Sequence, residues 1–451
     1  MRAISLSRSS LLRRVRYCLP AALAIAFLSS GCGSRGDAVK VAHIYDPLSG
    51  PSMKANVDWL SEVIEAYVQE HPATKISLEQ IKWDEIDAKL LTDYRAGAAH
   101  DLVWTSPQWM PKHFYTGDLL DLAPLLNWDA NEVADFSWNP VWSKCREGET
   151  QIGIPTGAHT RLVCFRRDMF ADAGLDPDNP PETLEALVDA ALKLTRDADG
   201  DGEPDVWGLG VYCGRSRGTI ELAFAPILWH LGGELWDPST RKATFASPAG
   251  VQTAQFLYDL IHKHKVCPAW CATGTYDDAI LKPFLAGKLA MGWGWGSYWI
   301  EVLEQEGWIQ GLFPPTRDGK PVKADVFITP TGPQAQFTNA WTLSVHALSK
   351  RPEQAADLLD FIARPERLAA FPDAGLPARR ATWERPEYET RFWQTWRLAA
   401  EKGRPMPATR YYNELADGVA AAIQRIILEG APIEETLKQA EDEYNARLAG
   451  T

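Results

Sequence analysis

The chain has 451 residues, of which 45% are hydrophobic and 23% are charged, so it contains ample material for a folded core. Its formal net charge of -13 at pH 7 argues against nucleic acid as a partner, because binding to phosphates requires a basic surface. The 19 tryptophans indicate unusually extensive aromatic packing or binding surfaces.

The first residues indicate a targeting segment rather than part of the fold. Five arginines precede an apolar run at residues 19–27, which is too short to span a membrane. Small residues then lead to Cys32 in a pattern that resembles a bacterial lipoprotein cleavage site, although Leu28 stands four residues before the cysteine rather than three. We expect residues 1–31 to be a signal peptide and residues 32–38 to be a tether lipidated at Cys32. The alternative is an ordinary signal peptide in which Cys32 has no role.

Five cysteines remain beyond this segment, and an exported protein meets an oxidising compartment in which disulfides persist. They are Cys145, Cys164, Cys213, Cys267 and Cys271. Cys267 and Cys271 stand four residues apart in a loop-like stretch and are candidates for a local disulfide; Cys145 with Cys164 is a second candidate pair. Because five is an odd number, we expect at least one free thiol.

From residue 39 the sequence alternates between strand and helix patterns. Strand patterns at residues 39–45 and 75–81 flank a helical pattern at 57–68. A second helical pattern at 84–98 leads to a short apolar strand at 101–104. This β-α-β-α-β order is typical of the parallel sheet of an α/β protein.

Ligands bind beyond the carboxyl ends of the strands in open sheets of this kind. Asp46 and the segment at residues 104–106 are therefore candidate site residues. The Asp46 carboxylate is suited to accept hydrogen bonds from ligand hydroxyls, and its alternative role is a turn cap before Pro47. Trp104 belongs either to the cleft or to the core.

A second α/β pattern begins after residues 153–155. A strand pattern at 162–165 is followed by a helical pattern at 184–192, for which Thr183 is a suitable N-cap. Later helical patterns occur at 251–263, 353–363 and 413–448, and later strand patterns at 207–211, 289–291 and 341–345.

Several motifs occur in one order and span nearly the whole mature chain. They lie at residues 153–175, 181–185, 284–291, 328–345, 355–362 and 375–379. Together they resemble the extracellular solute-binding proteins of the sugar-binding class, the maltose-binding-protein-like binders of ABC importers. Leu184 departs from the family pattern, in which a tryptophan is usual at this place.

The resemblance implies an α/β, two-lobed periplasmic-binding-protein fold with a hinge and discontinuous lobes. Lobe 1 would comprise residues 39–156 and 329–377, and lobe 2 would comprise residues 157–328 and 378–451. It further implies a monomeric binding protein rather than an enzyme, held outside the cytoplasmic membrane (periplasmic or cell-surface) by the lipid on Cys32. Its partners would be a sugar ligand, an ABC permease and the ATPase of that permease.

A sugar site needs flat aromatic surfaces and convergent hydrogen-bonding groups. Trp293 and Trp295, in the Gly/Trp segment at residues 291–299, are the first choices for stacking, and the alternative is that they pack in the core. The resemblance also makes Trp341, Trp229, Arg379, Tyr411 and Tyr412 candidates for ligand binding. For Trp341 and Trp229 the alternative is again a place in the core. Arg379 has an alternative role as an ion-pair partner at the hinge.

An aspartate-rich loop carries a second kind of chemistry. Asp197, Asp199, Asp201 and Asp205 occupy the first, third, fifth and ninth positions of an EF-hand-type loop. The twelfth position is Gly208 instead of a bidentate glutamate. The loop is therefore either a structural calcium site, away from the cleft, or a simple turn. No other cofactor is expected.

Three other functions remain open. An exported sugar-active enzyme would need a catalytic carboxylate pair, and no distinctive pair stands out. A binder of the same fold for a glycerol phosphodiester, a polyol or a polyamine is the second. An anionic solute would require clustered basic residues, of which only Arg379 and Arg161 are evident, and a polyamine would require carboxylates such as Asp46 and Glu234. A sensory or structural lipoprotein without a transporter is the third.

Overall fold

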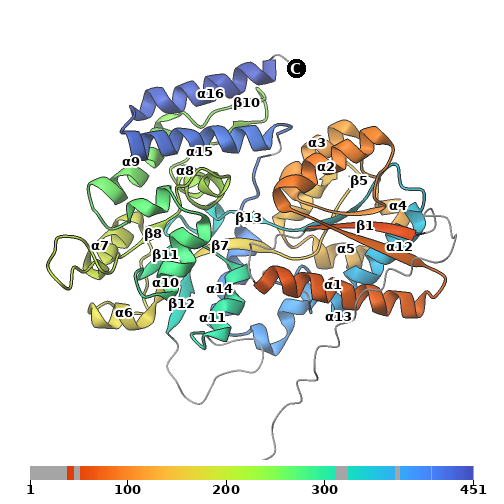
Figure 1. Cartoon of the computed structure of the whole chain (residues 1–451), viewed down its shortest axis with the longest axis horizontal. Coiled ribbons are helices and arrows are strands. Elements are labelled where there is room, and N and C mark those ends of the chain that lie inside the picture. The colour runs from red at the N-terminus through yellow and green to blue at the C-terminus, as the bar shows by residue number, and fades with distance from the viewer. Residues whose placement is uncertain (1–37, 45–50, 310–322, 371–375, 408, 450–451) are drawn as a thin grey trace, which may run out of the picture. The chain divides into compact units, whose positions relative to one another are not determined.

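The computed structural model describes residues 38–44, 51–309, 323–370, 376–407 and 409–449 (Figure 1). The predicted signal peptide, Cys32 and Asp46 lie outside the described residues. Within the described part of the chain, no helix has the length and apolar character needed to cross a membrane.

A five-stranded sheet, in the order β2-β1-β3-β14-β6, organises the first part of the fold. Its strands are β1 (Ala38–Ile44), β2 (Lys75–Ile81), β3 (Leu102–Thr105), β6 (Ile154–Pro155) and β14 (Thr342–Val345). β1 and β3 run parallel, as the sequence pattern predicts, and the intervening helices are α1 (Pro51–Glu70) and α2 (Trp83–Ala96). β14 comes from a distant part of the chain and pairs antiparallel with both β3 and β6.

This sheet has its own hydrophobic core. β3 is buried along its whole length and β1 along most of it, as expected for strands covered on both faces. Helix α12 (Pro352–Ala363) contributes the fully buried Leu358, Leu359 and Phe361 to the same core. We call the described residues of 38–156 and 340–370 the first lobe.

A second sheet follows the order β12-β7-β11-β8, and β13 also pairs with β7. Its strands are β7 (His159–Arg166), β8 (Gly210–Val211), β11 (Met291–Gly296), β12 (Ala324–Phe327) and β13 (Thr338–Asn339). The longer helices of this part are α7 (Leu184–Leu194), α9 (Pro248–His262), α14 (Arg391–Lys402), α15 (Tyr412–Glu429) and α16 (Ile433–Ala449). Figure 1 shows α15 and α16 side by side, and α15 also packs against α9. Thr183 Oγ1 accepts a hydrogen bond from the Ala186 amide at 3.1 Å, which confirms the predicted N-cap.

Shorter α-helices and strands lie between these elements. The helices are α3 (Met110–Thr116), α4 (Ala123–Leu126), α5 (Ala130–Phe136), α6 (Arg167–Asp172), α8 (Ala225–His230), α10 (Lys282–Leu285), α11 (Ile300–Gln305) and α13 (Pro365–Leu368). The strands are β4 (Arg146–Glu147), β5 (Thr150–Gln151), β9 (Trp236–Asp237) and β10 (Lys242–Ala243). We call the described residues of 157–339 and 379–449 the second lobe, because most of their apolar side chains share one core.

The chain passes from one core to the other three times, so each lobe is built from separate pieces of chain. The first crossing lies between Ile154, in the core of the first lobe, and Ala158, in that of the second. The second differs from the prediction of residue 329: Phe337 still belongs to the second core, and Ala340 is the first residue of the return that belongs to the first core. The crossing is later because β13 pairs with β7 before the chain leaves the second lobe.

The five cysteines are free, buried thiols. Cys145 lies in the core of the first lobe and Cys164 in that of the second, so the prediction of a disulfide between them is wrong. Cys267 and Cys271 lie together in the core of the second lobe, where both are unoxidised in this structure.

Candidate functional site

A cavity of about 320 Å³ has walls from both lobes. The first lobe contributes residues of α2 and of the turn and helix that follow β3, and the second lobe contributes the residues at the start of α15. The lining of the cavity includes Asp87, Gln108, Trp109, Lys112, Arg410, Tyr411, Tyr412 and Asn413. We call this cavity the cleft pocket.

A charged pair lines the first-lobe side of the cleft pocket. The Lys112 ammonium donates to Asp87 Oδ1, and both side chains are largely buried, with 18% and 14% of their surface exposed. Asn413 Nδ2 of the second lobe donates to the other oxygen of Asp87 across 3.4 Å. The Asp87 carboxylate therefore joins the two lobes through hydrogen bonds.

Aromatic rings line the second-lobe side. The Tyr412 hydroxyl donates to Glu221 Oε1 at 2.6 Å, and burial raises the pKa of Glu221 above its ordinary value despite this hydrogen bond. The guanidinium carbon of Arg410 lies 3.7 Å from the ring centroid of Tyr115 in α3 and 5.1 Å from that of Tyr411. Arg410 thus stacks on a ring of the opposite lobe by a cation–π contact.

A neutral polar network lies where β3 ends, as expected for the carboxyl end of a parallel strand. Ser106 Oγ donates to Gln108 Oε1 at 2.7 Å, and Asn339 Nδ2 donates to the same Gln108 oxygen at 2.6 Å. Because Asn339 belongs to β13 of the second lobe, this network also links the lobes. The predicted segment at residues 104–106 therefore reaches the interface through Ser106.

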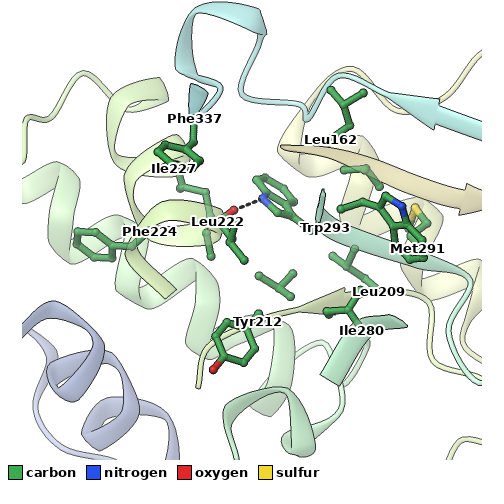
Figure 2. Packing of buried hydrophobic residues seen from close by; sticks show 14 of the residues in the cluster. Leu162, Leu209, Tyr212, Leu222, Phe224, Ile227, Ile280, Met291, Trp293 and Phe337 are labelled. Carbon is green, nitrogen blue, oxygen red and sulfur yellow. Dashed lines mark hydrogen bonds between the residues drawn. The ribbon is translucent and has the colours of Figure 1, made fainter. Parts of the chain in front are cut away.

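The two first-choice tryptophans do not line the cleft pocket. Trp293 and Trp295 are both fully buried in the second core. Trp293 Nε1 donates to the Leu222 carbonyl at 2.8 Å, and Figure 2 shows this indole among the aliphatic side chains of the cluster. The reason is topological: β11 lies between β7 and β8 inside the sheet. A bulge at Gly294, whose φ of 83° lies in the left-handed region, separates the two tryptophans. In this structure both tryptophans pack in the core.

The other predicted aromatic residues divide between the core and the interface. Trp104 is fully buried and packs edge-on against His43 at 4.6 Å between centroids. Trp341 is half-buried at the second crossing and meets His159 edge-on at 5.7 Å. Trp229 lines a separate cavity under Arg404, and Tyr411 and Tyr412 line the cleft pocket.

Arg379 has a structural role in this fold. Its guanidinium donates to Asp135 Oδ2 at 2.8 Å and to Glu132 Oε2 at 2.7 Å, and it is almost completely buried. Both carboxylates belong to α5 of the first lobe, so Arg379 fastens the third crossing to that lobe. The observed contacts are therefore those of an ion-pair partner at the hinge, the alternative role of Arg379.

The aspartate-rich loop brings three of its four carboxylates together. Asp197, Asp199 and Asp205 each offer an oxygen within 4.8 Å of the others, whereas Asp201 is not part of this group. These carboxylates already accept backbone hydrogen bonds, such as those from the Gly200 and Gly202 amides to Asp197 at 2.7 and 2.9 Å. Calcium binding remains a prediction.

Several residues of the interface have no signal in the sequence analysis, among them Asp87, Lys112 and Asn413. Asp87 lies inside a pattern that correctly predicts a helix, and nothing in that pattern distinguishes it from solvent-facing acidic residues. Gln108 had a usable signal, because it follows the end of the third strand by three residues.

Comparison with known families gives one match. The family model described as bacterial extracellular solute-binding protein matches residues 50–367. Among sequence relatives, a Brucella abortus protein named only as a binding protein is 23% identical over 97% of this chain and 99% of its own length. A probable amino-acid ABC transporter periplasmic-binding protein of Sinorhizobium fredii is 26% identical over 70% and 69%. An uncharacterised lipoprotein of Streptomyces antibioticus is 25% identical over 82% and 79%.

Two solved structures show the same fold. An ABC transporter solute-binding protein of Thermotoga lettingae, bound with alpha-D-tagatose, has a TM-score of 0.74 at 24% identity and covers 91% of this chain and 99% of its own. Maltose-bound MalE3 of T. maritima has a TM-score of 0.72 at 21% identity and covers 90% and 98%. These matches confirm the predicted two-lobed fold.

Proposed function

Because this chain belongs to the bacterial extracellular solute-binding proteins, we propose that it captures a sugar or oligosaccharide between its lobes for an ABC importer. The bound form would be recognised by a membrane permease, whose ATPase drives uptake. The solved neighbours named above, one bound to tagatose and one to maltose, support a sugar as the solute class.

The observation that carries the proposal is the cleft pocket, whose walls come from both lobes. Tyr411 offers ring surface for the C–H face of a sugar, and Gln108, Asn413 and the Asp87–Lys112 pair offer donors and acceptors for hydroxyls. A volume of about 320 Å³ lies at the small end of the range for ligand pockets. A mono- or disaccharide fits this size better than a long oligosaccharide.

The location follows from the same proposal. A solute-binding protein must work outside the cytoplasmic membrane beside its permease, and a lipid on Cys32 would hold it there. The lipoprotein from Streptomyces antibioticus, which aligns with 82% of this chain, supports the anchor. Labelling cells that express the chain with a clickable fatty acid, with Cys32→Ser as the unlabelled control, tests it.

Binding without turnover distinguishes this proposal from a sugar-active enzyme. The family and the neighbours are binding proteins, and we propose that this chain shares that property. Prolonged incubation with the bound glycan, followed by chromatography of the sugar, should return it unchanged. Appearance of a cleaved product would favour the enzyme instead.

Calorimetric titration of the mature chain tests the solute class. The panel contains mono- and disaccharides, polyols and amino acids, because one relative carries an amino-acid name. We expect saturable binding of a sugar that Tyr411→Ala weakens. Tyr258→Ala on α9, which removes a ring stacked on His262 away from the pocket, is the matched control. Saturable binding of an amino acid and of no sugar would replace the solute class but keep the transport role.

A further inference from the structure

A second cavity, of about 330 Å³, also has walls from both lobes. The first lobe contributes Lys144 and Pro140, and the second lobe contributes Trp229, Glu234, Trp236 and Arg404. We call it the basic pocket. Two cations and one carboxylate give its lining a net positive charge, in a chain whose formal net charge is -13.

Lys144 is the unusual member of this lining. It is half-buried, and among the described residues no carboxylate forms an ion pair with it. Burial, and after it the charge of Arg404, lowers the pKa of Lys144. An ammonium that is partly removed from water and faces another cation is in an unfavourable environment, which an anion would relieve.

Arg404 is held in place from three sides. Its backbone is fixed because its amide donates to the Gln336 carbonyl at 2.6 Å and its carbonyl accepts from the Thr338 amide at 3.0 Å. Its guanidinium carbon lies 4.7 Å from the ring centroid of Trp229, and its Nη2 pairs with Glu234. One carboxylate leaves other guanidinium N–H donors available for a second acceptor, since arginine has five.

We propose that the basic pocket binds an acidic group, a carboxylate or a phosphate, which bridges Lys144 of the first lobe and Arg404 of the second. The indoles of Trp229 and Trp236 would flank the rest of the molecule, so a sugar acid or a sugar phosphate fits this site better than a bare anion. The anion satisfies the uncompensated charge and joins the lobes, so its binding favours the arrangement in which Lys144 and Arg404 face one cavity. This inference goes beyond the proposed function, because it concerns a different cavity from the cleft pocket.

Three probes distinguish whether the site recognises a carboxylate, a phosphate or a neutral sugar. They are D-glucuronate, D-glucose as its neutral counterpart, and inorganic phosphate, each titrated calorimetrically into the mature chain at low ionic strength. We expect glucuronate or phosphate to bind with a dissociation constant of about 1 mM or tighter, and addition of salt to weaken that binding. Binding of glucuronate alone identifies a carboxylate site, and binding of phosphate alone identifies a phosphate site.

Three variants test the residues. Lys144→Gln removes the unpaired cation and should weaken binding of the acidic probe about tenfold, the usual effect of losing a hydrogen bond to a charged group. Glu234→Gln removes the competing carboxylate and should strengthen it, an opposite change that general damage to the fold cannot produce. Lys193→Gln, on the exposed face of α7, makes the same charge change elsewhere and should have no effect.

The result that overturns the proposal is also specific. If neither glucuronate nor phosphate binds in the millimolar range, the basic pocket is not an anion site. The same conclusion follows if Lys144→Gln and Lys193→Gln change the binding equally. Neither result bears on sugar capture in the cleft pocket, which the Tyr411→Ala titration tests separately. Conversely, acidic probes that bind through Lys144 while no neutral sugar binds would support this site and remove the sugar proposal.

Discussion

Asn413, at the start of α15, donates a hydrogen bond to Asp87 of α2 across 3.4 Å, and Lys112 of α3 donates to the same carboxylate. One carboxylate of the first lobe therefore holds a partner within its own lobe and a partner in the other. The first pair is largely buried and gives Asp87 a fixed position. The second contact exists only while the lobes are close, so it is suited to stabilise a closed arrangement rather than the fold.

Asn413→Ala should weaken solute binding without lowering the stability of either lobe. A long hydrogen bond to a charged group is worth about 1 kcal/mol, which corresponds to an affinity loss of about fivefold. Calorimetric titration gives the affinity and urea unfolding gives the stability. Gln439→Ala on the exposed face of α16 is the control. An unchanged affinity would mean that the Asp87–Asn413 contact plays no part in closure.

Trp293→Ala should lower stability because the indole is fully buried and its N–H satisfies the Leu222 carbonyl. Removal of a large buried aromatic side chain costs about 3–5 kcal/mol in the free energy of unfolding, and the Leu222 carbonyl would lose its partner. Urea unfolding followed by circular dichroism measures the loss. If the variant keeps its stability but loses sugar affinity, Trp293 stacks on the ligand and the core assignment is incorrect.

Acid should destabilise this protein through its buried histidines. Burial lowers the pKa of His43 from 6.5 to about 3, and burial with the charge of Arg161 does the same for His159. The unfolded chain binds these protons below pH 6.5 while the folded chain does not, so stability is lost as the pH falls from 6.5 towards 3. Each histidine contributes a slope of about 1.4 kcal/mol per pH unit.

The free energy of unfolding in urea, measured at several pH values between 7 and 5, checks this slope. His43→Phe keeps an aromatic ring beside Trp104 and should make the slope shallower, because one proton-binding group is gone. His71→Phe, at a half-buried position just after the end of α1, is the control for the histidine-to-phenylalanine change itself. Equal slopes for the wild type and His43→Phe would mean that His43 is not buried as a neutral ring.

The sequence predicts the fold well because the signals that determine it are local and cumulative. The alternation of strands and helices up to Thr105 predicts the parallel pairing of β1 with β3, and Thr183 marks the start of α7. The cleft pocket is harder to predict, because it depends on which helix faces meet across two lobes. The family pattern points to Tyr411 and Tyr412, which line the cleft pocket, whereas Asp87 and Lys112 stand 25 residues apart and have no local signature.

The tryptophans show the limit of residue-type arguments. Alternating glycine and tryptophan at residues 291–296 is compatible both with a ligand platform and with an interior strand. Only the position of β11 between two other strands decides between them, and that position depends on contacts with β7 and β8, which are distant in sequence. The role of Arg379 is hard to predict for the same reason, since its two carboxylate partners lie more than 240 residues away in the sequence.

The aspartate-rich loop offers the last test. Oxygens of Asp197, Asp199 and Asp205 already converge, and a bound Ca²⁺ would offset the repulsion between the three carboxylates. We therefore expect millimolar Ca²⁺ to raise the melting temperature. Affinity should be weak because Gly208 replaces the bidentate glutamate. Asp199→Asn should abolish the shift, and Mg²⁺ should not reproduce it, because magnesium demands a tighter octahedral shell. A melting temperature that is the same in Ca²⁺ and in chelator would identify the loop as a turn, stabilised by the hydrogen bonds that the Gly200 and Gly202 amides donate to Asp197.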